Sequence, residues 1–294
     1  MSRCYNEKEV SKGVHMRKVK IPKTQIFCFL LILIVCIIAI VEALYYVMNG
    51  DIIESEKEGN NNTNDIEVSE TNLVENFDDL FQNTFNNSNT SENAEKISSD
   101  KDYVYTEYAK QEVNSGNYEI DVNIPTININ SEEVKSYNEE IKHVFQAKAE
   151  SILNGGADRS IYSVDYEAYL NNNILSVVIK STLKEGSNPQ RLIVQTYCYD
   201  IKEMKKVEFS DIMKIKNLDT ATAQDKITRQ MQGKQSEAKA LQQLGYPAYI
   251  RDLRSDRYDV ENISNFFIDD NNNVYVIYAY GNTENTDVID IIIF

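Results

Sequence analysis

Hydrophobic residues are distributed unevenly along this chain of 294 residues. Residues 26–48 form an almost continuous apolar run whose only charged residue is Glu42. As a helix this run would be roughly 34 Å long, which is enough to cross the ~30 Å hydrocarbon core of a bilayer. The pattern predicts a transmembrane helix and therefore a single-pass membrane protein.

The flanks of the run predict its orientation. Residues 1–25 contain seven Lys and Arg but only two Glu, whereas acidic residues follow the run directly. An excess of Lys and Arg marks the cytoplasmic side of a membrane. We therefore expect a basic cytoplasmic tail at 1–25, a signal-anchor at 26–48, and an extracellular C-terminal domain at the cell membrane.

A cleaved signal peptide is the second interpretation of the apolar run. Val41 and Ala43 are small residues at the spacing that signal peptidase prefers. However, the run is longer than the 7–15 residues typical of a signal-peptide core. A retained anchor is the preferred interpretation, and cleavage after Ala43 is an open alternative.

Polar residues dominate the next segment, 49–100, which is acidic and rich in Asn and Ser. Such a composition offers too little apolar surface to offset the entropy of an ordered chain. We therefore expect a disordered linker. Within it, residues 73–81 carry apolar side chains at helical spacing and predict a transient helix.

Regular patterns begin near residue 101 and continue to residue 294. Alternating apolar positions predict strands, and apolar positions at helical spacing predict helices. The predicted strands are 103–113, 117–124, 161–170, 174–183, 191–200, 264–268, 274–280 and 287–294, and the predicted helices are 130–154 and 220–244. Runs of strands broken by two helices predict an α+β fold, an antiparallel sheet with two helices packed on it. We expect two sub-units, at about 101–185 and 186–294.

The net charge of −16 limits the partners of this domain. An acidic surface disfavours nucleic acid and favours cationic proteins. Of the four cysteines, only Cys198 lies in the predicted extracellular domain. A disulfide within that domain is therefore excluded, and we expect Cys198 to be a buried thiol in a strand.

The residues of common catalytic and metal sites are scarce in the predicted domain. His143 is its only histidine, which is too few for a zinc site with several histidine ligands. A Ser-His-Asp or Cys-His site would have to use His143, whose position in the middle of a predicted helix is more simply that of a surface or groove residue. Nucleotide-binding glycine motifs and hydrolase motifs are absent from the sequence. We expect no cofactor and no enzymatic activity, although paired carboxylates of a hydrolase are an open alternative.

Tyrosine is abundant, with 19 residues against 10 Phe and no Trp. Most of the strand tyrosines are expected to pack within a sheet, but tyrosine is also favoured at protein interfaces. A polar loop follows the penultimate strand and is the predicted binding site. Its residues are Tyr280, Gly281, Asn282, Thr283 and Glu284.

Several pieces of this pattern are similar to a known family. They include Ile124-Pro125, Leu175-Ser176-Val177 and the segment 209–212 (FSDI). Residues 103–294 resemble the ectodomain of the lysozyme-sensing sigma-V-type anti-sigma factors, which also stands ahead of the catalytic domain in some peptidoglycan deacetylases. The resemblance implies an extracytoplasmic α+β domain that binds a protein or wall component, with basic lysozyme as one suitable partner.

Three functions follow from these observations. The preferred one is a membrane-anchored extracytoplasmic binding or sensing module in the cell envelope of a Gram-positive-type bacterium. Its partners would be lysozyme, another cationic envelope protein or peptidoglycan. The alternatives are an anti-sigma factor released by cleavage near the membrane, and a cell-wall hydrolase.

Overall fold

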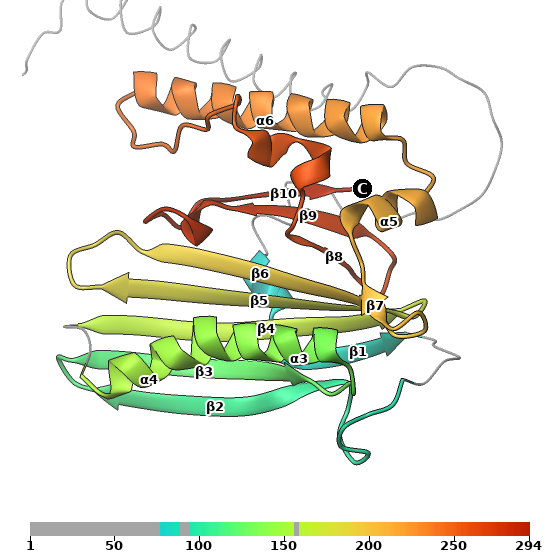
Figure 1. Ribbon diagram of the computed structural model, residues 1–294. Coiled ribbons are helices and arrows are strands. Elements are labelled where there is room, and N and C mark those ends of the chain that lie inside the picture. Colours follow the sequence, from blue (N-terminus) through green and yellow to red (C-terminus); the bar gives the residue numbers. More distant parts are fainter. Residues whose placement is uncertain (1–76, 89–93, 156–158) are drawn as a thin grey trace, which may run out of the picture. The chain divides into compact units, whose positions relative to one another are not determined.

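The computed structural model describes residues 77–88, 94–155 and 159–294 (Figure 1). They belong to one compact unit, residues 66–294. The fold is mixed α+β, with one large sheet, one small sheet and few helices.

The large sheet has seven strands, and two of its pairings are parallel. Six strands follow the order β2-β3-β4-β5-β6-β7, and β1 lies beside the second half of β4. β3–β4 and β1–β4 are parallel, and the other pairings are antiparallel. The strands are β1 (Thr84–Ser88), β2 (Val104–Asn114), β3 (Tyr118–Ile127), β4 (Ser160–Asn171), β5 (Ile174–Glu185), β6 (Arg191–Asp200) and β7 (Lys205–Lys206).

The predicted sheet is therefore wrong in one respect, because it is mixed rather than antiparallel. A helical crossover between β3 and β4 brings the chain back in the same direction, which makes these neighbours parallel. The crossover consists of α3 (Glu132–Ile141), a π-helical segment η2 (Lys142–Gln146) and α4 (Ala147–Leu153). The side chain of Ser131 caps its start by accepting a hydrogen bond from the Val134 N–H.

The central hairpin of the sheet is fixed by its turn. Asn172 and Asn173 both have positive φ, 47° and 67°, as a two-residue type I′ turn requires. The turn sets the register in which Asn171 pairs with Ile174. The next hairpin, β5–β6, contains the position 185/186 where the sequence predicts a boundary between two sub-units.

The small sheet is antiparallel in the order β10-β9-β8. One face packs on the large sheet, where Phe267, Tyr275 and Ile277 join Val178 and Val194 in one apolar cluster. Its strands are β8 (Phe266–Ile268), β9 (Val274–Ala279) and β10 (Ile289–Ile293), and the other helices are α5 (Phe209–Ile215) and α6 (Thr220–Gln243), with short turns η3 (Asp256–Tyr258), η4 (Val260–Asn262) and η5 (Tyr280–Asn282).

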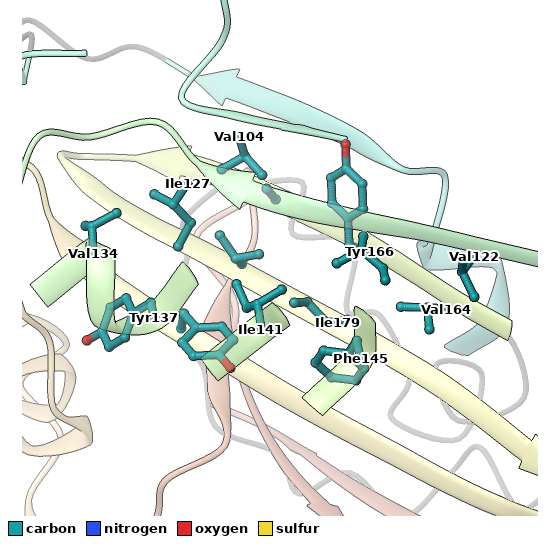
Figure 2. Close-up of a cluster of buried hydrophobic side chains, with 14 of the residues drawn as sticks. Val104, Val122, Ile127, Val134, Tyr137, Ile141, Phe145, Val164, Tyr166 and Ile179 are labelled. Carbon is teal, nitrogen blue, oxygen red and sulfur yellow. The ribbon is translucent and has the colours of Figure 1, made fainter. Parts of the chain in front are cut away.

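The helices lie on opposite sides of the two sheets. α3 and α4 cover one face of the large sheet, where Tyr137, Ile141 and Phe145 pack on Val164 and Ile179 (Figure 2). α5 and α6 cover the far face of the small sheet. The described elements therefore form four layers, helix–sheet–sheet–helix, instead of two helices on one sheet.

The predicted transmembrane helix is corrected. No helix in the described ranges is long and apolar enough to cross a membrane. Helix α6 has sufficient length, with 24 residues, but only one side of it is buried. The apolar run 26–48, the tail 1–25 and the cleavage residues Val41 and Ala43 lie outside the described residues.

The predicted disordered linker is also corrected, because part of 49–100 belongs to the fold. Residues 77–80 form a 3₁₀ turn, η1 (Phe77–Leu80), and β1 extends the large sheet. β1 has few apolar residues, so its sequence carries no strand pattern. Its polar atoms are held instead by the buried Glu167 of β4, which accepts hydrogen bonds from Gln82 N (3.0 Å), Thr84 Oγ1 (2.5 Å) and Asn86 Nδ2 (2.7 Å).

Candidate binding cleft at the edge of β6

The predicted binding loop divides into a buried half and an exposed half. Tyr280 and Gly281 are buried in η5, and Asn282 is half-buried. Thr283 and Glu284 are exposed. Asn282, Thr283 and Glu284 are therefore accessible to a partner, whereas Tyr280 and Gly281 are structural.

Gly281 is the point at which η5 touches the large sheet. A Cβ atom at this position would overlap the Leu192 carbonyl and the Thr286 carbonyl. The Arg191 guanidinium donates hydrogen bonds to the carbonyls of Gly281 and Asn282, the latter at 3.0 Å. Glycine allows this close approach of two backbones.

Asn282 fixes the loop against the outer edge of β6. Its side-chain amide accepts a hydrogen bond from the Val194 N–H (3.0 Å) and donates one to the Val194 carbonyl (2.8 Å). One side chain thus satisfies both backbone groups of an edge residue, as a neighbouring strand would.

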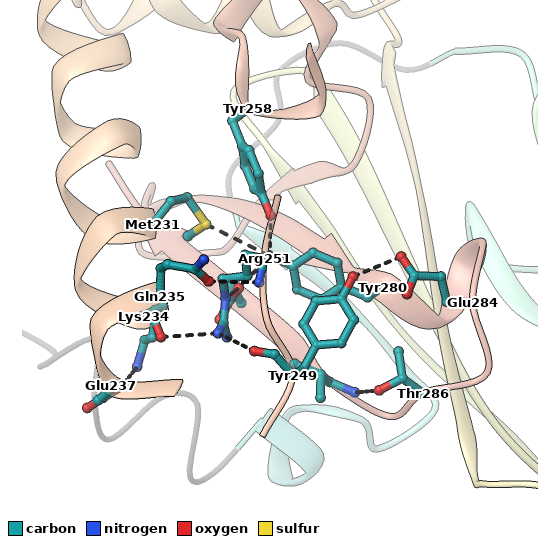
Figure 3. Close-up of polar contacts among 12 residues, drawn as sticks. Met231, Lys234, Gln235, Glu237, Tyr249, Arg251, Tyr258, Tyr280, Glu284 and Thr286 are labelled. Atoms are coloured by element: carbon teal, nitrogen blue, oxygen red, sulfur yellow. Dashed lines mark hydrogen bonds and ion pairs between the residues drawn. The ribbon is translucent and has the colours of Figure 1, made fainter. Parts of the chain in front are cut away.

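A buried polar network holds the loop from the other side (Figure 3). Asp290 of β10 accepts two hydrogen bonds from the Arg251 guanidinium, at 2.5 and 2.6 Å. It also accepts one from the Tyr280 hydroxyl at 2.6 Å, and that hydroxyl lies 2.8 Å from the Tyr258 hydroxyl. The Arg251 N–H donates to Gln235 of α6 at 2.8 Å.

The electrostatics of this network favour a neutral phenol beside an ion pair. Burial, and then the Asp290 carboxylate, raise the pKa of Tyr280 far above its usual value. The Arg251–Asp290 pair is bidentate, and its side chains are only 8% and 2% exposed. Such a pair is a structural connection between β10 and the chain after α6, because it is almost fully shielded from solvent.

An open cleft lies next to this loop at the outer edge of β6. Its volume is about 470 Å³, and its walls come from α3, from β6 and from the segment before β8. Tyr137 and Glu140 line it from α3, and Asn282 lines it from the predicted loop. Residues 206–208 complete the lining, so the cleft forms where five segments that are distant in sequence meet at one sheet edge.

The cleft carries an excess of negative charge. Glu140 and Glu261 are exposed residues of its lining and make no ion pair or hydrogen bond within the described part of the chain. The one lysine of the lining, Lys206, is paired with Glu208 at 3.0 Å. Two carboxylates thus face the cleft without compensation.

A smaller cavity of about 200 Å³ adjoins the cleft. Asn262, Ser264 and Asn282 line both of them. Its inner wall includes Tyr278, whose buried hydroxyl has no hydrogen-bond partner among the described residues.

The reactive groups near the cleft are not arranged for nucleophilic chemistry. Cys198 lines the cleft, but it is buried and donates a hydrogen bond to the Phe266 carbonyl at 3.3 Å. Burial raises the pKa of the Cys198 thiol to about 12, so it stays protonated at neutral pH. His143 is exposed on η2 and is not part of the lining. No cluster of His, Cys, Asp and Glu in the described ranges could hold a metal ion.

Sequence reasoning found one wall of the cleft and missed the others. It singled out Asn282 and Thr283, which line the cavities. It did not find Glu140, Glu261 or Ser264. Glu140 follows the polar side of a helix like many other acids, and residues 261–265 carry no periodic pattern, so no local signal separated them from ordinary surface residues.

Comparisons with known proteins add little to this site. No protein-family model matches the sequence, and no curated protein matches it significantly. Among solved structures, one DUF3298 family member from Bacteroides fragilis has 14% identity and a TM-score of 0.30, with 54% of this chain and 74% of that chain covered. A DUF3298 family protein from Pseudomonas aeruginosa has 10% identity and a TM-score of 0.34, with 60% and 78% covered. Similarity at this level assigns neither the fold nor the function.

Proposed function

We propose that this domain is a non-enzymatic binding module that captures a cationic protein in the cleft beside β6. The observation that carries the proposal is the pair of uncompensated carboxylates, Glu140 and Glu261, in the lining of a 470 Å³ cleft. Carboxylates in a recess attract a basic partner, raise the rate of association and add specificity for basic partners.

Further features support binding rather than catalysis. The cleft is lined by amides and hydroxyls such as Gln195, Asn262 and Ser264, which can hydrogen-bond a partner without reacting with it. The loop Tyr280–Asn282 is fixed by Arg191 and by the buried network, so the wall it forms is preorganised. The resemblance to lysozyme-sensing ectodomains makes lysozyme the first cationic protein to test.

The experiment measures binding of the full-length chain to lysozyme by titration calorimetry at 50 and 300 mM salt. We expect saturable binding that weakens at the higher salt, because salt screens exposed charges. The double substitution Glu140→Gln and Glu261→Gln should weaken binding by about tenfold, which corresponds to ~1.4 kcal/mol. The matched control, Glu119→Gln with Glu237→Gln, removes the same charge away from the cleft and should change the affinity by less than about twofold.

The other outcomes contradict the proposal. Loss of affinity in both double variants would show that only overall charge matters. No binding to lysozyme, together with binding to soluble peptidoglycan fragments, would make the chain a wall-binding protein. Cleavage of those fragments would make it a hydrolase that uses the cleft carboxylates.

A further inference from the structure

The outer edge of β6 has a gap that opens on the cleft. In an antiparallel ladder, alternate residues direct their N–H and C=O groups to opposite sides. At the end of β6, the Ile201 N–H donates to the Asn173 carbonyl at 2.8 Å, on the β5 side. Odd-numbered residues of β6 therefore bond to β5, and even-numbered residues face outward.

Most of these outward groups already have partners. The Leu192 N–H donates to the Thr286 carbonyl at 3.0 Å, and Val194 is satisfied twice by the side chain of Asn282. At the other end, the Cys198 carbonyl accepts a hydrogen bond from the Val207 N–H at 3.0 Å. The edge is thus closed on both sides of Thr196.

At Thr196 both outward backbone groups lack a partner, whereas Leu192 and Cys198 each have one of the two bonded. Its side-chain Oγ1 accepts a hydrogen bond from the Phe266 N–H at 2.9 Å, but its backbone N–H and C=O have no partner within the described part of the chain. It is half-buried and lines the cleft. From Val194 to Cys198 a strand rises roughly 13 Å, which is room for about three to four residues of an added strand.

We propose that an extended segment of a basic protein adds to β6 as an extra strand, with one of its residues exchanging both backbone hydrogen bonds with Thr196. This inference rests on the proposed function and names its mode of recognition. Main-chain bonds to an exposed strand supply affinity in such complexes, and side-chain pockets supply specificity. Here a Lys or Arg of the segment contacts the carboxylates of Glu140 and Glu261.

The cleft geometry favours an extended segment over a folded surface. The opening runs along a sheet edge between two layers, with Tyr137 on one side and Ser264 on the other. An unpaired strand edge is usually covered, because it templates further pairing. The gap at Thr196 is uncovered over a length that matches a short peptide, and its charge excludes acidic ones.

The test uses an eight-residue peptide of alternating Lys and Thr with blocked ends, and two versions that are N-methylated either at every Lys or at every Thr. All three peptides carry the same charge, but each methylated version lacks the N–H donors of one strand edge. We expect the full-length chain to bind the parent peptide and one methylated version, and to bind the other at least about tenfold more weakly, since a lost hydrogen bond costs about 1–1.5 kcal/mol.

Amide hydrogen exchange gives a second readout on the protein itself. Peptide binding should slow exchange of the Thr196 amide by at least about tenfold, whereas the Val194 amide, which is already bonded to Asn282, should not change.

The outcomes separate this inference from the proposed function. Equal binding of all three peptides, weakened by Glu140→Gln with Glu261→Gln, would overturn strand addition and leave a charge-based binding module. Binding of lysozyme without binding of any peptide would also overturn strand addition. If neither lysozyme nor the peptides bind, the proposed function itself fails.

Discussion

Tyr278 lies near the end of β9 and Tyr280 begins η5, but their hydroxyls have different surroundings. The Tyr280 hydroxyl bonds to Asp290 and contacts Tyr258, whereas the Tyr278 hydroxyl is buried without a partner among the described residues. We expect Tyr280→Phe to lower the free energy of unfolding by about 1–3 kcal/mol, because it leaves part of a buried carboxylate unsatisfied.

Tyr278→Phe is the matched control, since it removes a hydroxyl that makes no hydrogen bond among the described residues. It should leave the free energy of unfolding unchanged or raise it by up to about 1 kcal/mol. Urea denaturation of both variants provides the measurement. Equal destabilisation by the two substitutions would show that the network at Asp290 contributes nothing particular.

At the scale of elements, the contact between η5 and β6 fixes the position of the cleft wall that the loop Tyr280–Asn282 forms. Gly281→Ala should be strongly destabilising, by more than about 2 kcal/mol, because the new methyl group overlaps the backbone of Leu192 and neither backbone can move freely. The expected result is a lower midpoint of unfolding, measured by circular dichroism.

Gly233→Ala provides the comparison in α6. A Cβ at this position meets no atom within 4 Å, so the substitution should stabilise the chain by about 0.5–1 kcal/mol through helix propensity. If Gly281→Ala were tolerated as well as Gly233→Ala, then η5 would not be fixed against β6.

The elements themselves were largely predictable from the sequence. The pattern predicted β5 and β6 closely. Their apolar residues pack on neighbouring layers and so give a clear strand pattern, and Asn172-Asn173 marked the turn between β4 and β5. β1 was not predictable, since its polar residues are ordered by Glu167, which lies 81 to 85 positions away along the chain from the residues it bonds. The parallel pairing of β3 with β4 follows from the crossover path, which local patterns do not encode.

The binding cleft was predictable only in part for a related reason. Its most specific feature, the free backbone of Thr196, is a property of the strand edge and not of any side chain. The acidic walls come from Glu140 and Glu261, which are brought together only when α3 and the chain after α6 meet at β6. The sequence therefore predicted the loop beside the cleft but not the cleft itself.

At the scale of the whole molecule, η1 and β1 make residues 77–88 part of the stable fold. Phe77 is buried against the large sheet, and Asp78 pairs with Lys180 at 2.8 Å. A chain that begins at residue 101 should therefore unfold at a lower urea concentration than one that begins at residue 66. Loss of the buried Phe77 alone is expected to cost about 3–5 kcal/mol. Equal unfolding midpoints for the two chains would show that residues 77–88 do not stabilise the fold and act as linker.

The central claim is that a basic protein binds in the cleft beside β6, and a single substitution tests it directly. Ser264 is exposed and lines both cavities, so Ser264→Trp fills the cleft without disturbing the core. Asn271→Trp places the same side chain on the exposed turn after β8 and is the control.

The measurement is the dissociation constant of each full-length variant for lysozyme, with unfolding midpoints recorded alongside. The account predicts that Ser264→Trp weakens binding by at least about 30-fold, or ~2 kcal/mol, at an unchanged midpoint, while Asn271→Trp stays within about twofold of the unsubstituted chain. Undiminished binding by Ser264→Trp would contradict the claim and place the partner on another surface.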